Sequence, residues 1–198
     1  GTPLYTASYK GHTKVVERLL AQDGVNVNQT YKDGGTPLYI ATKEGHSEVV
    51  ERLLAKDGVD VNQAEKNGAT PLYIACCKGY KNVVDMLLAQ DGVIVNQPYK
   101  DGGTPLCIAS RNGHLGLVAS LVFQGVVPRE RDMPLLRRVL GPFLKSMETD
   151  YVAVLTFKMC LLRVTVGHAL RGMSIYGDHP VRIIESFLLP CCQDTFLP

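Results

Sequence analysis

The chain has 198 residues, of which 45% are hydrophobic and 20% charged, a composition that excludes a disordered protein. Lys and Arg total 21 against 19 Asp and Glu, so the formal net charge of +2 excludes a strongly basic nucleic-acid-binding protein as the default interpretation. The 6 cysteines show no C-x-x-C spacing, which predicts neither a zinc ribbon nor a redox motif. We therefore expect reduced thiols in an intracellular, cytoplasmic protein.

A tandem repeat organises the first two thirds of the chain. Thr-Pro-Leu occurs at 2–4, 36–38, 70–72 and 104–106, always 34 residues apart. Segments 2–35 and 36–69 are identical at 22 of 34 positions. A recurrence at this period is the signature of a stacked repeat architecture and predicts a solenoid.

Each unit begins with a short predicted helix. Thr2 can cap its start, and Pro3 suits the first turn because its missing N–H would have no partner there. Leu4 and Ala7 mark one face of this helix. Gly11 is expected to end it, since glycine tolerates the left-handed conformation at that position.

A second helix is predicted from Thr13, followed by a loop. Four apolar residues recur at helical spacing and predict a buried stripe: Val15, Val16, Leu19 and Leu20. Gly24 is expected to terminate this helix. Residues 25–35 end in Lys-Asp-Gly-Gly, which predicts a hairpin-like turn. One unit cannot bury its apolar stripe alone, so neighbouring units are expected to stack.

The recurring sequences Thr-Pro-Leu-Tyr, Gly-His, Val-Val-Glu-Arg-Leu-Leu and Gly-Val-Asn-Val-Asn resemble the ankyrin repeat over residues 1 to about 125. The resemblance implies an all-α ankyrin-type helical solenoid with hairpin loops, in four repeats: 2–35, 36–69, 70–103 and 104–125. Two departures stand out: the unit has 34 residues and not the family's usual 33, and the histidine of the family's Thr-Pro-Leu-His is replaced. The replacements are Tyr5, Tyr39, Tyr73 and Cys107. The family's loop-bracing hydrogen bond is therefore in question.

The resemblance also implies a non-catalytic protein-binding module that acts as a scaffold, because the family usually holds its partners on hairpin tips and on the exposed side of the first helices. The residues at these positions are Tyr9, Lys10, Lys32, Asp33, Lys43, Glu44, Lys66, Asn67, Cys77, Lys78, Lys100, Asp101, Arg111 and Asn112. Seven are basic and three acidic, although residues 1–124 carry 12 charges of each sign. This predicts a basic concave groove for an acidic protein segment. The alternative is a row of solvated lysines.

Residue patterns for other chemistry are missing from the sequence. There is no G-x-S-x-G and no phosphate-binding loop, so we expect no enzymatic activity and no cofactor. The repeat histidines His12, His46 and His114 lie one helix spacing of about 8–10 Å apart, too far to share a metal ion. Charges about 10 Å apart cooperate little, so no nucleic acid is expected either. The asparagines Asn28 and Asn62, with Asn96, are expected to bond loop backbone.

Residues 126–198 lack the repeat and read as a C-terminal apolar helical segment with runs at 133–140 and 151–170. The second helix of the fourth unit has lost its charged outer face, so we expect this tail to cap it; a decayed repeat is the alternative. The longest stretch without charged residues, 112–128, is too short for a membrane span, and we expect no membrane association.

Two rival functions remain open. One is the recruitment arm of a larger enzyme or of a ubiquitin-ligase complex, because Pro134, Leu135, Val139 and Phe143 dimly resemble a ligase-adaptor box. The other is a membrane-tethered array, which rests on the apolar tail alone.

Overall fold

Pairs of short helices follow one another along the described part of the chain, one pair in each predicted repeat. The computed structural model describes residues 1–123, 126, 134 and 138. The helices are α1 (Pro3–Tyr9), α2 (Thr13–Leu20), α3 (Pro37–Glu44), α4 (Ser47–Leu54), α5 (Pro71–Lys78), α6 (Lys81–Leu88), α7 (Pro105–Arg111) and α8 (Leu115–Phe123). Within 1–123 no strand is present. The all-α repeat solenoid predicted from the sequence is confirmed.

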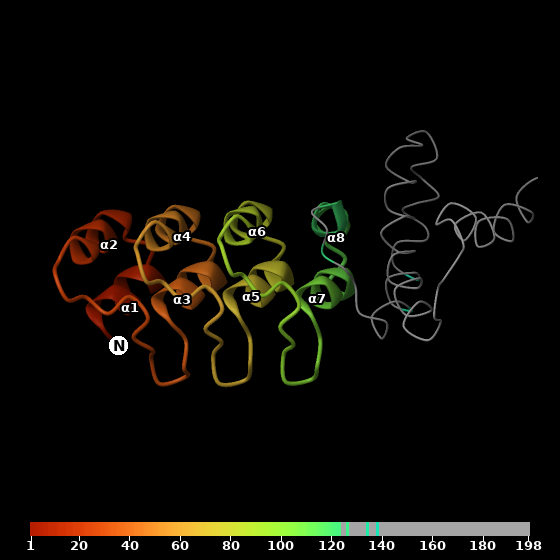
Figure 1. The fold of residues 1–198 in the computed structure, drawn as a ribbon, viewed down its shortest axis with the longest axis horizontal. Coiled ribbons are helices and arrows are strands. Elements are labelled where there is room, and N and C mark those ends of the chain that lie inside the picture. Colours follow the sequence, from red (N-terminus) through yellow and green to blue (C-terminus); the bar gives the residue numbers. More distant parts are fainter. Residues whose placement is uncertain (124–125, 127–133, 135–137, 139–198) are drawn as a thin grey trace, which may run out of the picture.

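The helices stack in two rows. Figure 1 shows α1, α3, α5 and α7 side by side in an inner row, with α2, α4, α6 and α8 beside them in an outer row. Each inner helix packs against the next inner helix and against its own outer helix. The loops that join successive pairs project from the inner row, on the side away from the outer row. Loop tips and inner helices therefore lie on a common side of the stack.

Threonine caps fix the start of every inner helix. The side-chain oxygen of the threonine before each proline accepts the backbone N–H three residues on, at 3.1 Å in all four cases. The four pairs are Thr2 with Tyr5, Thr36 with Tyr39, Thr70 with Tyr73, and Thr104 with Cys107. Such a cap contributes typically about 1 kcal/mol to stability.

Glycine at the end of an inner helix makes room for the next pair. Gly11 has φ +70°, and a Cβ atom there would come within 2.7 Å of the His46 ring. The His46 Nε2 atom lies 3.0 Å from the carbonyl oxygen of Tyr9. Glycine is therefore needed at position 11 both for its backbone conformation and for the contact between pairs. The outer helix α2, by contrast, ends at Leu20, and Gly24 lies in the turn beyond it, not at the predicted helix end.

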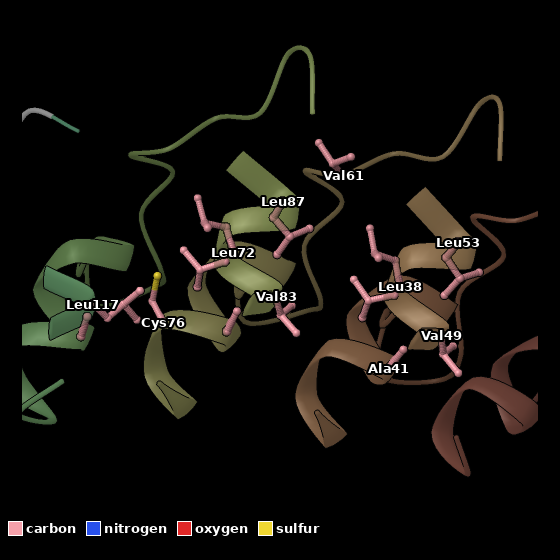
Figure 2. Close-up of a cluster of buried hydrophobic side chains, with 14 of the residues drawn as sticks. Leu38, Ala41, Val49, Leu53, Val61, Leu72, Cys76, Val83, Leu87 and Leu117 are labelled. Atoms are coloured by element: carbon pink, nitrogen blue, oxygen red, sulfur yellow. The ribbon is translucent and has the colours of Figure 1, made fainter. Parts of the chain in front are cut away.

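The core lies between the two rows. Six leucines are fully buried there: Leu38, Leu53, Leu72, Leu87, Leu106 and Leu121. Figure 2 shows how the side chains of adjacent pairs meet, with Ala41 and Val49 near one junction and Cys76 and Leu117 near another. Burying one such side chain stabilises the fold by about 1.5–3 kcal/mol.

The predicted buried stripe of α2 is only half buried. Val16 and Leu20 lie in the core, but Val15 is 47% exposed and Leu19 is partly exposed. The counterpart of Val15 in the second pair, Val49, is 1% exposed. This side of an outer helix is covered by the pair that precedes it, and in the part of the chain that the structure describes no pair precedes α1 and α2.

Turns close the loops, and backbone bonds link them. The N–H of Tyr31 donates to Gly35 O at 2.9 Å, and the loops at 65–69 and 99–103 repeat this bond. Adjacent tips are joined where Lys66 N donates to Asp33 O at 2.9 Å and Lys100 N donates to Asn67 O at 3.1 Å. The hairpin-like loops form one continuous edge.

Loop asparagines also join one loop to the next. Asn28 Nδ2 donates to Gly58 O at 2.7 Å, and Asn28 Oδ1 accepts the N–H of Asp60 at 2.8 Å. Asn62 makes the corresponding bonds to Gly92 and Ile94. The predicted role of these two asparagines is confirmed.

Most predictions for residues 126–198 fall outside the described residues: the apolar helical runs, the cap, the decayed repeat and the ligase-adaptor box. Val126 itself is described; it is buried in the core, and its N–H donates to Leu121 O at 3.0 Å. None of the helices that the structure describes has the length and apolarity that crossing a membrane requires.

Candidate protein-binding surface

The fourteen predicted site residues gather on the loop tips and at the C-terminal ends of the inner helices. We call these fourteen residues the inner face. All are exposed except Asp33, Lys43 and Cys77, which are half-buried. Tyr9 is a large aromatic residue with half of its surface, 50%, open to solvent. The inner face is therefore accessible along the whole stack.

Lysines occupy the same place in three successive tips. The side chains of Lys32 and Lys66 make no hydrogen bond or ion pair with any described residue. The Lys100 Nζ atom donates to Asn67 Oδ1 at 3.1 Å and lies 5.5 Å from the centroid of the Tyr99 ring. Two of the three tip charges are thus free to meet a partner.

The aspartates of the tips shape the loops. Asp33 Oδ1 accepts the N–H of Gly35 at 3.0 Å, and Asp101 Oδ1 accepts that of Gly103 at 2.7 Å. The second oxygen of Asp101 lies 3.7 Å from Arg111 Nη1. The structure therefore brings Asp101 and Arg111 together, a contact that sequence reasoning missed.

Two members of the inner face, Cys77 and Asn112, belong to a contact between the third and fourth pairs. Asn112 Nδ2 donates to Cys77 O at 2.7 Å, and His114 Nε2 lies 3.0 Å from the same oxygen. His114 thus repeats the role that His46 has at the junction between the first and second pairs. His46 and His114 therefore join pairs, and no group of three or more potential metal-ligating side chains occurs among the described residues. Burial raises the pKa of the adjacent Cys76 thiol, which stays protonated.

A pocket of about 430 Å³ opens on the inner face between the first and second pairs. Four predicted site residues line it: Tyr9, Asp33, Lys43 and Glu44. The other lining residues are Gly1, Tyr5, Thr6, Tyr31 and Ile40. Sequence reasoning placed the first four on the same face but did not foresee that they surround one cavity.

Tyrosine pairs brace the loops where the family's histidine is replaced. The rings of Tyr5 and Tyr31 stack with centroids 4.9 Å apart, and those of Tyr73 and Tyr99 stack at 5.0 Å. Both pairs are separated by the same interval in the sequence, which is the signal that would have revealed them. Burial, with the nearby Asp33 carboxylate, raises the pKa of Tyr5 to about 12. Its hydroxyl group is therefore neutral at physiological pH.

Comparison with known proteins adds one match. A family model described as ankyrin repeats (3 copies) matches residues 1–65 and 57–132, which together make up well over half of the chain. No curated protein shows significant similarity to the chain.

Proposed function

The chain belongs to the ankyrin-repeat family, and we propose that it binds an acidic segment of a protein partner on its inner face. Ankyrin repeats are generally protein–protein interaction modules and are typically non-catalytic. The observation that carries the proposal is the charge of the inner face, with seven basic residues against three acidic ones in a stack that is otherwise acidic.

Free tip lysines favour an acidic partner. Lys32 and Lys66 are exposed and their ammonium groups have no partner among the described residues, so their charges are not neutralised within the stack. Charge complementarity of this kind speeds encounter and sets orientation more than it raises affinity. We therefore propose that the lysines steer the partner and that the surface around them holds it.

The linked tips reduce the cost of binding. Backbone bonds between Asp33 and Lys66 and between Asn67 and Lys100 hold successive tips in register. A surface that is ordered before it binds loses less conformational entropy when a partner arrives. This supports recognition by a preformed surface.

The test compares two double charge reversals, using the fluorescence anisotropy of a labelled glutamate-rich peptide. Lys32→Glu with Lys66→Glu changes the inner face. We expect it to weaken binding by about tenfold at low salt, the effect of replacing two attractive surface charges by repulsive ones. The salt dependence of the association rate should flatten as well.

The matched control is Lys14→Glu with Arg18→Glu on the outer helix α2. Both residues are exposed and make no ion pair within the described part of the chain, so the change in net charge is the same. Arg52 is unsuitable as a control because its Nε atom pairs with Glu17 Oε1 at 2.7 Å. Equal weakening by the two variants would contradict the proposal, and so would no weakening by either.

A further inference from the structure

The junction between the third and fourth pairs combines a tyrosine stack with an ion pair of aspartate and arginine. The rings of Tyr73 and Tyr99 stack at 5.0 Å, and Asp101 stands near them at the loop tip. The guanidinium of Arg111 lies 3.7 Å from the Asp101 carboxylate. Burial, with the nearby Asp101 carboxylate, raises the pKa of Tyr73 to about 12, and the Arg111 guanidinium acts in the opposite direction.

The junction between the first and second pairs repeats this arrangement without the guanidinium. Tyr5 and Tyr31 stack at 4.9 Å, and Asp33 takes the place of Asp101. The position of Arg111 is occupied here by Lys43, which forms no ion pair with Asp33. Tyr5, Tyr31, Asp33 and Lys43 all line the pocket of about 430 Å³.

Two substitutions make this junction more favourable for a cation than its counterpart. Tyr9 stands where the third pair has Cys77, and it adds a third ring to the pocket wall. Glu44 stands where the fourth pair has Asn112, and it adds a second carboxylate. Both carboxylates, Asp33 and Glu44, help to raise the pKa of Tyr5, so their negative charge extends over the pocket.

We propose that this pocket binds an arginine side chain of the protein partner, in the manner in which the third junction holds Arg111. The inference rests on the proposed function, and it specifies the partner further as an acidic segment that contains an arginine. A guanidinium is planar and weakly hydrated, so it packs on tyrosine faces and pairs with carboxylates at once. In this proposal the partner's guanidinium donates to Oδ2 of Asp33, because Oδ1 already accepts the N–H of Gly35.

Lys43 brings a positive charge to the same pocket. Because Lys43 lines the pocket, its charge repels an incoming guanidinium and would attract an incoming carboxylate. Replacing Lys43 with methionine removes this charge and retains an unbranched side chain. Arginine should then bind more tightly, whereas an anionic ligand would bind more weakly, so this variant determines the sign of the occupant's charge.

The experiment is a titration of the full chain with the blocked tripeptide acetyl-Gly-Arg-Gly-amide, observed through the NMR signals of the tyrosine rings. We expect saturable shifts of Tyr5, Tyr9 and Tyr31, with a Kd on the order of 1 mM for a single side chain. The citrulline tripeptide has nearly the same shape and no charge, and it should shift these signals little. Equal shifts with citrulline would overturn the proposal.

Variants locate the site. Asp33→Asn should weaken the binding of the arginine tripeptide by about tenfold, because a charge-assisted hydrogen bond is lost. Asparagine stands at the equivalent position 67, where the tip retains its turn, so the variant is expected to fold. The control is Asp57→Asn, an exposed aspartate of the turn after α4, which should leave binding unchanged. Unchanged affinity in Asp33→Asn, or weaker binding in Lys43→Met, would overturn the proposal.

The two proposals fail separately. The tripeptide carries no acidic residue, so its binding does not depend on Lys32 and Lys66. If the tripeptide binds as expected while the reversals at Lys32 and Lys66 have no effect on the acidic peptide, the arginine pocket stands and the acidic partner is wrong. If only the acidic peptide binds as expected, the pocket proposal is wrong.

Discussion

The first and second helix pairs have nearly the same sequence and different environments. Segments 2–35 and 36–69 agree at 22 of 34 positions, and Val-Val-Glu-Arg-Leu-Leu is identical in α2 and α4. Yet Val15 is 47% exposed and Val49 only 1%. Likewise, the ring of His46 reaches the carbonyl of Tyr9, whereas the ring of His12 has no hydrogen-bond partner among the described residues. In this fold, burial depends on the junction between pairs more than on the sequence of a pair.

The largest expected difference between the two pairs is the stability lost when an equivalent leucine is truncated. Leu53→Ala should cost about 2–5 kcal/mol, because Leu53 is fully buried and a cavity would remain. Leu19→Ala, at the equivalent position, should cost on the order of 1 kcal/mol, since Leu19 still contacts water. Urea denaturation followed by circular dichroism measures both. Equal losses would mean that the exposed side of α2 is covered in solution.

Replacing the glycine of the turn after the outer helix should destabilise both pairs equally. Gly58 has φ +80° and Gly24 has φ +75°, and a Cβ atom at either position would meet no atom within 4 Å. Changing either glycine to valine should therefore cost more than about 1 kcal/mol through backbone strain alone. The same urea experiment applies. If Gly24→Val is harmless while Gly58→Val is not, the turn after α2 does not hold its conformation in solution.

The smallest expected effect concerns the histidine between pairs. His46→Ala should cost about 0.5–1.5 kcal/mol, because it removes the bond to the Tyr9 carbonyl. His12→Ala should remain within about 0.5 kcal/mol of the unmodified chain, since the ring of His12 makes no hydrogen bond with any described residue. Thermal unfolding at matched concentrations can resolve this pair. A larger loss of stability for His12→Ala than for His46→Ala would contradict the role of His46 in joining the two pairs.

Features that depend on one pair alone were predictable from the sequence. The Thr-Pro start of each inner helix and the left-handed glycine at its end depend on residues within a single unit. The buried face of α1 followed from Leu4 and Ala7 for the same reason. Propensity and periodicity report such local features directly.

Features that depend on two pairs were predictable only in part. The exposure of Val15 and the contact of Arg111 with Asp101 depend on how one pair is placed against the next, which no single unit records. The pocket between the first two pairs has the same origin, because its walls come from α1, α3 and the loop tip between them. The recurrence of tyrosines such as Tyr5 and Tyr31 could have predicted the ring stacking, but only once the repeats had been aligned with one another.

The glycine at the end of each inner helix has a consequence for how such a chain can grow. Gly11 faces the ring of His46, Gly45 faces that of Tyr80, and Gly79 faces that of His114. Every unit thus carries a ring that can pack on the preceding unit and a glycine that leaves space for the ring of the following unit. A tandem duplication of the coding segment creates both halves of a new junction in one event. The array can be lengthened by inheritance alone, with no compensating change elsewhere in the chain.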